Sequence, residues 1–157
     1  MTDLFVRNQY INMNTLKRNA IVPYSARQMF ELVNNIEDYP RFLPWCSKSH
    51  IIERSDKEIV AELEISWKGM HKSFSTRNVL TPCERIDMNL VNGPLRHMEG
   101  IWTFQTLNDH ACKVFLDLEF EFAGGFLDRF FQPVFQNIAN TLVEAFCKRA
   151  VELYGNE

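Results

Sequence analysis

The stretch ACKVFLDLEFEFAGG, from Ala111 to Gly125, decides the fold because it contains a complete strand and the point where that strand stops. Apolar side chains alternate with mostly charged ones at a period of two, which is typical of a strand with one buried face. The pair Gly124–Gly125 then marks a break in the chain. The residues on the face expected to be buried are Cys112, Val114, Leu116, Leu118, Phe120 and Phe122.

After the glycine pair, the apolar period changes to that of a helix and continues from Phe126 to about Tyr154. Pro133 lies inside this pattern, where it is expected to kink the helix or to mark a new start. Gly155 follows as a stop. The sequence therefore predicts one long amphipathic helix after the last strand.

The chain before Ala111 reads as further strands with the same alternation, joined by tight turns such as Asn92–Pro94. About six consecutive strands joined in this way predict an antiparallel meander. They follow a first strand at Thr15–Pro23 and a short helix, which Ser25 and Gln28 open as a capping box. We expect an α+β fold in which a curved antiparallel sheet of about seven strands wraps around the long C-terminal helix. The short helical segment follows strand 1.

Length and composition indicate one soluble domain, because 157 residues with 46% hydrophobic and 24% charged content suit a single core. We expect this domain to span residues 14–157, after a flexible N-terminal extension over residues 1–13. The net charge of −3 argues against nonspecific nucleic-acid binding, so no DNA partner is expected. Four separated cysteines without a C-x-x-C motif indicate reduced thiols. With no apolar run near the roughly 20 residues of a membrane span, we expect a cytoplasmic protein, at most peripheral to the inner membrane.

No motif for catalysis or metal binding stands out. The four histidines form neither H-x-H nor H-E-x-x-H, and no G-x-S-x-G elbow occurs. Carboxylates such as Glu62 and Glu64 lie opposite an apolar strand face, where solvated charges are the common case. We therefore predict a non-enzymatic protein with no metal site and no catalytic cofactor.

The apolar strand faces favour an internal cavity. Trp102 and Phe104 share a face with Gly100, which leaves room for either a bulge or a ligand. Thr76 and Asn78 share a phase with apolar neighbours, and a few polar groups on an apolar wall can orient a quinone, a sterol or a polyketide. An equal alternative is that Asn78 caps a bulge or bonds to the backbone. For the phenylalanines, plain core packing is the competing explanation.

The segment IEDYPRFLPWC, from Ile36 to Cys46, is unusually apolar for a loop. Its two prolines are expected to hold it in a nonhelical path. We predict that Tyr39, with Phe42 or Leu43, turns inward as a plug and that Trp45 lies at the rim of the cavity. The alternative is a rigid lid that makes no contact with a ligand.

Five motifs in this order carry a family resemblance: VPYSARQMFELVNNIEDYPRFLPWC, FSTRNVL, MNLVNGP, GIWTF and LEFEF. Together they closely resemble the bacterial ribosome association toxins and the mitochondrial coenzyme Q-binding proteins, a branch of the START-like, polyketide cyclase-type helix-grip superfamily. The resemblance runs from about Thr15 to Tyr154. It implies a sheet that grips the long helix around a hydrophobic tunnel.

The resemblance implies two functions. The one we expect is non-enzymatic binding of ubiquinone or another prenyl lipid in the cavity, which would support respiratory electron transport with transient membrane contact. The alternative is a toxin that binds the large ribosomal subunit and blocks subunit joining, with Lys68, Lys72 and Arg77 as candidate rRNA contacts. For these cations a solvated strand face is the more common explanation. The candidate cavity residues are Phe42, Leu43, Trp45, Phe74, Asn78, Leu90, Trp102, Phe104, Phe120, Phe131, Phe135 and Ile138.

Overall fold

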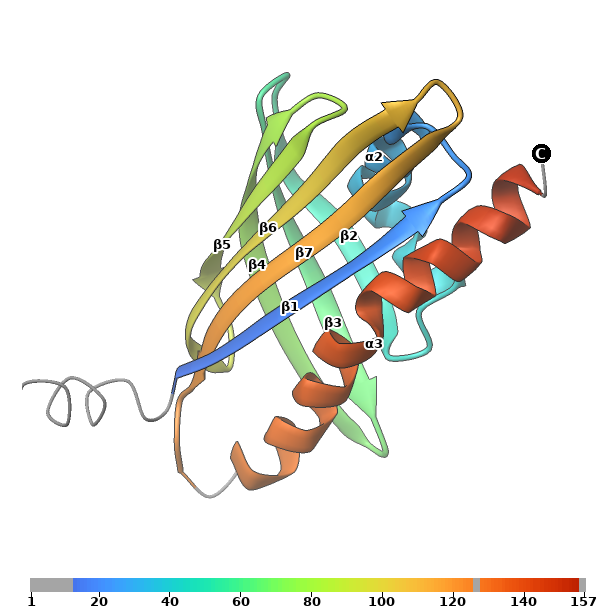
Figure 1. Cartoon of the computed structure of the whole chain (residues 1–157). Coiled ribbons are helices and arrows are strands. Elements are labelled where there is room, and N and C mark those ends of the chain that lie inside the picture. Colours follow the sequence, from blue (N-terminus) through green and yellow to red (C-terminus); the bar gives the residue numbers. More distant parts are fainter. Residues whose placement is uncertain (1–12, 126–127, 156–157) are drawn as a thin grey trace, which may run out of the picture.

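The computed structural model describes residues 13–125 and 128–155. The expected flexible extension over residues 1–13 therefore falls almost entirely outside the described residues. The elements follow the predicted order of strand, short helix, six strands and long helix (Figure 1). They are β1 (Met13–Val22), α2 (Ala26–Asn34), η1 (Ile36–Arg41), β2 (Cys46–Arg54), β3 (Glu58–Trp67), β4 (Met70–Thr81), β5 (Arg85–Asn92), β6 (Leu95–Asn108), β7 (Ala111–Phe122) and α3 (Asp128–Tyr154).

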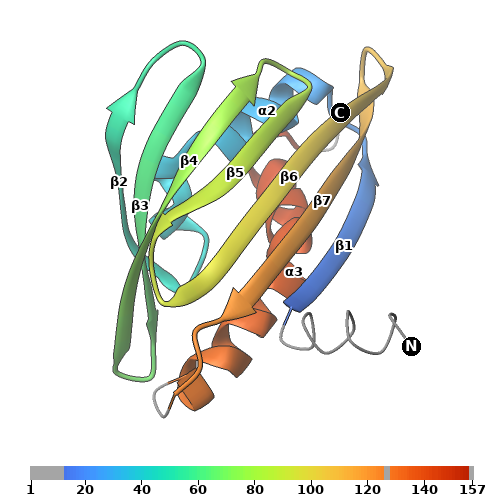
Figure 2. The same cartoon turned by 90° about the vertical axis from the view of Figure 1, so that its left-hand side faces the viewer.

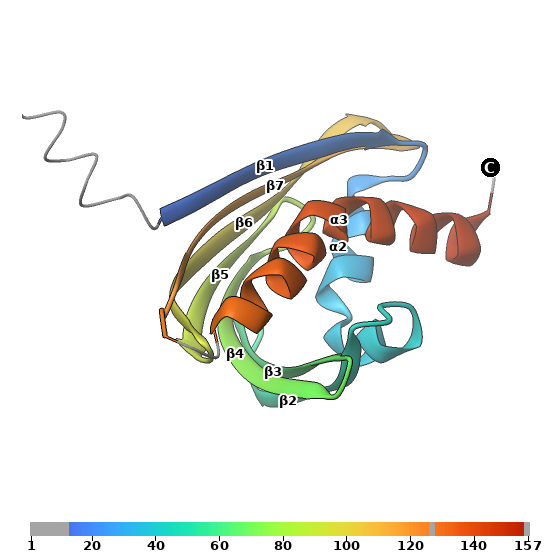
Figure 3. The ribbon, with the colours of Figure 1, turned by 90° about the horizontal axis from the view of Figure 1, so that it is seen from below.

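All seven strands form one antiparallel sheet in the order β1-β7-β6-β5-β4-β3-β2, which Figure 2 shows across its width. Strands β2 to β7 form the predicted meander, and β1 joins it at the far side by pairing with β7. Viewed from below, the sheet curves around α3, which lies along its concave face (Figure 3). This arrangement confirms the predicted α+β helix-grip fold.

Strand β7 shows how the sequence period produces this arrangement. Its side chains alternate between buried and half-buried over the whole length of the strand. The buried phase faces α3 and contributes to a single large core, in which Leu116 is 0% and Val114 1% exposed. Burying apolar side chains on one face of a sheet and one face of a helix is the main stabilising term of such a fold.

The short helix α2 begins as predicted. The Ser25 hydroxyl accepts a hydrogen bond from the Gln28 backbone N–H at 3.1 Å, and the Gln28 side chain accepts one from the Ser25 N–H at 2.9 Å. This capping box satisfies two donors that the first turn of a helix leaves unpaired.

The expectation of a nonhelical path after α2 is wrong, because Ile36–Arg41 forms the 3-10 helix η1 with Pro40 inside it. The i+3 hydrogen bonds of this segment come from the backbone N–H groups of residues other than Pro40. The Asp38 N–H donates to the Asn35 carbonyl at 3.1 Å, and the Phe42 N–H donates to the Tyr39 carbonyl at 3.2 Å. The N–H that proline lacks is therefore not needed in this short helix.

Helix α3 is one continuous helix of 27 residues, so the suggestion of a new start at Pro133 is wrong. Pro133 lies in the second turn, where its ring removes only the hydrogen bond to the carbonyl of Arg129. The carboxylate of Asp128, the first residue of the helix, accepts hydrogen bonds from the Gly124 backbone N–H at 3.1 Å and the Gln132 side chain at 3.0 Å. These contacts fix the start of α3 against the end of the sheet.

Candidate functional site

An apolar cavity of about 80 Å³ lies between the concave face of the sheet and α3. This volume is below the roughly 150 Å³ of a cavity that can hold benzene, so no substituted quinone ring fits in it as it stands. The cavity is lined by Ile36, Tyr39, Trp45, Ala61, Leu63, Phe74, Thr76, Asn78, Met88, Met98, Trp102, Leu116, Leu118, Phe135, Ile138, Ala139, Leu142 and Phe146.

Two polar side chains on β4 interrupt this apolar lining. Thr76 is 9% and Asn78 5% exposed, and both point into the cavity, as the strand phase suggested. The Thr76 hydroxyl donates a hydrogen bond to Asn78 Oδ1 at 2.9 Å. Within residues 13–125 and 128–155, the Asn78 side chain makes no other hydrogen bond, so the explanation by backbone bonding does not hold. One end of a buried amide therefore faces the cavity without a protein partner, which is unusual.

Six of the predicted cavity residues line the cavity and six do not. The six that do not are packed around it as core or as partly buried neighbours of the core. Phe104, for example, is 3% exposed and stacks on the far side of Trp102 with ring centroids 6.4 Å apart. The lining residues are Trp45, Phe74, Asn78, Trp102, Phe135 and Ile138, and the others are Phe42, Leu43, Leu90, Phe104, Phe120 and Phe131.

The segment before β2 differs from its predicted arrangement. Trp45 is only 9% exposed and lines the cavity, so its predicted place at the rim is wrong. Leu43 is 1% exposed and packs in the core, while Tyr39 lines the cavity as expected. Tyr39 and Phe42 both pack edge-on against Phe146 of α3, with ring centroids 5.3 and 5.4 Å apart. The segment therefore covers one side of the cavity with rings that α3 holds in place.

The alternation of the strands did not predict the surroundings of two residues, Phe146 and Gly100. Phe146 is 1% exposed, lines the cavity, and its ring meets that of Trp102 edge-on with centroids 5.3 Å apart. Its helical spacing from Phe135 was visible in the sequence, but spacing alone cannot say which core residue faces a cavity. At Gly100, a Cβ would lie 2.7 Å from the terminal methyl of Met88 and 3.0 Å from Leu118, so neighbouring side chains already fill the room expected there.

A second, larger hollow opens at one end of the grip, where the β3–β4 hairpin lies near the first turns of α3 (Figures 1 and 2). It is a groove of about 820 Å³, and we call it the mouth groove. Ile138 lines both this groove and the inner cavity, so the two are adjacent. The mouth groove is lined by Trp67, Lys68, Gly69, Met70, His71, Lys72, Arg129, Phe130, Pro133, Val134, Asn137 and Ile138.

The three candidate rRNA contacts do not form one cluster. Lys68 and Lys72 line the mouth groove. Arg77 instead projects from the opposite face of β4, where its guanidinium pairs with Glu58 at 2.5 Å. A strand alternates its faces, so positions 72 and 77 point to opposite sides of the sheet. Arg129, which the sequence did not single out, replaces Arg77 as the third cation of the cluster.

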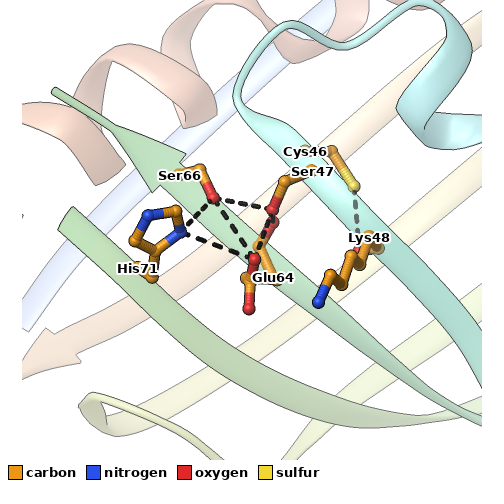
Figure 4. Close-up of polar contacts among 6 residues, drawn as sticks. All are labelled: Cys46, Ser47, Lys48, Glu64, Ser66 and His71. Atoms are coloured by element: carbon orange, nitrogen blue, oxygen red, sulfur yellow. Dashed lines mark hydrogen bonds and ion pairs between the residues drawn. The ribbon is translucent and has the colours of Figure 1, made fainter. Parts of the chain in front are cut away.

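A polar cluster on β2, β3 and β4 contains two serines, a histidine and a glutamate (Figure 4). The Ser47 hydroxyl donates to Glu64 at 2.7 Å, and this hydrogen bond is the main cause that lowers the pKa of the Glu64 carboxyl. His71 Nδ1 lies 2.8 Å from the Ser66 hydroxyl and 3.5 Å from the same carboxylate. A serine hydrolase uses one ring nitrogen for the serine and the other for the acid, so this geometry cannot relay a proton in that way.

His97, Glu99 and Glu119 lie together on β6 and β7, with potential metal-binding atoms within 4.8 Å of one another. His97 Nε2 lies 3.6 Å from a Glu119 oxygen, and this contact explains the grouping without an ion. None of the helices in residues 13–125 and 128–155 is long and apolar enough to cross a bilayer.

Comparison with known proteins connects this fold to a family. The family described as polyketide cyclase/dehydrase and lipid transport matches residues 22–147. The chain belongs to this family. It is 46% identical to the "Ribosome association toxin RatA" of Pseudomonas aeruginosa, over 89% of this chain and 97% of that protein. It is 43% identical to RatA of Vibrio cholerae, over 91% of this chain and 99% of that protein.

More distant relatives carry other names. The "Coenzyme Q-binding protein coq10, mitochondrial" of Schizosaccharomyces pombe is 24% identical over 85% of each chain. Among solved structures, an aromatase/cyclase from a Streptomyces species has a TM-score of 0.76 at 19% identity, over 88% of this chain and 93% of that one. A START superfamily protein of Mycobacterium smegmatis has a TM-score of 0.74 at 18% identity, over 88% of this chain and 98% of that one. At these identities the structures establish the fold alone.

Proposed function

We propose that this protein acts on the association of ribosomal subunits and does so by binding, without catalysing a reaction. The observation that carries this proposal is its identity of 43–46% with proteins named ribosome association toxin, along nearly the whole length of both chains. Such a target also places the protein in the cytoplasm.

The test is an association assay with purified ribosomal subunits. Separated subunits are mixed at the magnesium concentration that joins them, with and without the purified protein, and are resolved on sucrose gradients. We expect free subunits to increase with protein concentration and the protein to sediment with one of them. Unchanged gradients, with the protein left at the top, would refute the proposal.

A second candidate function is binding of a hydrophobic ligand, such as ubiquinone, in the inner cavity. The observation that favours it is the Asn78 amide, which faces an apolar cavity without a protein partner on one of its ends. A carbonyl or hydroxyl group of a ligand could satisfy that end. Because the cavity measures only about 80 Å³, binding a prenylquinone requires α3 or the segment before β2 to move outward.

This second function is tested by extraction. Protein made in a quinone-replete bacterial host is purified without detergent, extracted with solvent and analysed by mass spectrometry. We expect a prenylquinone or a similar lipid in amounts close to that of the protein. If no lipid is extracted and titrated quinone leaves Trp45 and Trp102 fluorescence unchanged, the cavity has no such ligand.

A further inference from the structure

The mouth groove combines exposed aromatic rings with an apolar floor. Trp67 at the end of β3 is 41% exposed and Phe130 near the start of α3 is 59% exposed. Between them lie Met70, Pro133 and Val134. Large apolar side chains that gather around one groove in this way usually mark a surface that meets a protein, a membrane or a ligand.

Cations without ion-pair partners surround this apolar floor. Lys68, Lys72 and Arg129 all line the groove, and none has an ion pair with any residue of the described ranges. The arginines elsewhere on the sheet differ, since Arg77 and Arg85 are both paired with carboxylates. Among the residues that the structure describes, no acidic side chain lines the groove. The groove is therefore a local positive surface on a protein with net charge −3.

The backbone of the β3–β4 turn holds Lys68 at an unfavourable conformation. Lys68 has φ 45° and Gly69 has φ 83°, the positive pair that a tight hairpin turn requires. Asparagine is the residue usually found at the first of these positions, because lysine pays a steric penalty there. A strained lysine at the tip of a hairpin points to a role for its charge outside the fold.

We propose that the mouth groove docks the protein on an anionic phospholipid bilayer. Tryptophan and phenylalanine favour the interface between headgroups and acyl chains, and nearby lysines and arginines attract the anionic headgroups. An RNA backbone would neutralise Lys68 and Arg129 but would leave the floor around Met70 and Val134 uncovered. A bilayer interface accommodates both the charges and the apolar floor, and this inference does not depend on the proposed action on ribosomes.

The groove lies next to the inner cavity, so docking on a bilayer would bring lipid close to the cavity. Ile138 lines both the groove and the inner cavity, so an apolar chain leaving the bilayer through the groove would arrive next to the cavity that Asn78 lines.

The experiment measures binding of the full chain to vesicles by sedimentation and by tryptophan fluorescence. The vesicles contain phosphatidylcholine alone or equal parts of phosphatidylcholine and phosphatidylglycerol. Of the three tryptophans, Trp45 and Trp102 are buried, so Trp67 reports contact at the groove. We expect binding to the anionic vesicles that weakens with salt, together with a shift of the emission to shorter wavelength.

Two double variants separate the groove from general charge. Lys68→Asn/Arg129→Gln removes one cation from the turn and one from α3, and should weaken binding roughly 30-fold, at about fivefold for each charge near the membrane. The matched control is Lys57→Gln/Lys148→Gln, which removes an exposed lysine from another turn and one from the far end of α3. Because these charges lie away from the groove, it should bind within roughly threefold of the unchanged protein.

Four outcomes would overturn the proposal, and the first three concern the vesicles alone. These are no binding to anionic vesicles at low salt, equal losses in the two double variants, or binding without any change in Trp67 emission. A fourth is that a single-stranded RNA competes with the vesicles at lower concentration through the same residues, which would assign the groove to nucleic acid instead. The sucrose-gradient result is independent of all four, because it uses no lipid.

Discussion

Replacing the polar pair in the cavity should make the protein more stable. The double variant Thr76→Val/Asn78→Leu keeps the shapes of both side chains close to the originals and removes both polar side chains that β4 contributes to the lining of the cavity. In the unchanged protein, one end of the Asn78 amide faces the apolar cavity without a protein partner, while Thr76 and Asn78 bond only to each other within the described residues. The variant removes a burial cost along with one hydrogen bond.

The two contributions have opposite signs and unequal sizes. Removing the unpartnered end of the amide should stabilise the fold by about 1–3 kcal/mol, while losing the Thr76–Asn78 hydrogen bond should cost about 0.5–1.5 kcal/mol. Part of the 80 Å³ cavity also becomes filled, which stabilises by about 24 cal/mol for each Å³. The net expectation is a gain of about 1–2 kcal/mol, or a rise in Tm of about 3–6 °C for a domain of this size.

Thermal and urea denaturation followed by circular dichroism measure this change. The single variant Thr76→Val is the control, and it should lose about 1 kcal/mol because it leaves the whole Asn78 side chain without a partner. A double variant less stable than the unchanged protein would refute the reasoning, since it would show that the pair contributes to the fold. The double variant should also retain less extracted lipid if Asn78 orients a ligand.

Three further predictions follow from single features. Lys68→Asn should raise stability by about 0.5–1 kcal/mol in urea denaturation, because asparagine accepts the positive φ of the turn; a loss would show that the lysine is not strained. Burial raises the pKa of the Cys46 and Cys112 thiols to about 11, so stability should fall as pH rises from about 9 to 11, where only the unfolded chain loses these protons, and replacing both by alanine should flatten that decline. Arg149→Met should cost about 2–3 kcal/mol in the same urea assay, because Arg149 pairs with Asp38 at 3.2 Å in a nearly buried site; an unchanged midpoint would contradict this.

The fold could be predicted from the sequence because its signals are local and periodic. The alternation in β7, the capping box of Ser25 and Gln28 and the long helical period of α3 each depend on residues a few positions apart. The 3-10 helix around Pro40 was missed because proline is a weak obstacle in a helix of only two turns. Periodicity, in short, establishes which elements form and which faces they bury.

The site could be predicted only in part, because its geometry depends on how distant elements meet. Strand phase places Trp102 and Phe104 on the same inner face, but only the position of α3 decides that Trp102 lines the cavity and Phe104 packs behind it. In the same way, Arg129 joins Lys68 and Lys72 only because the start of α3 lies beside the β3–β4 turn. No local pattern contains that information.

The pairing of β1 with β7 has a consequence for how the chain folds during synthesis. Met13 is opposite Glu121, which follows it by 108 positions (121 − 13) in the chain. At a synthesis rate of about 5–20 residues per second, roughly 5–20 s pass between the synthesis of β1 and that of its partner strand β7. Contacts so far apart in sequence also slow the formation of the folding nucleus. The edge of the sheet therefore closes last, and a nascent chain exposes β1 for longer than any other strand.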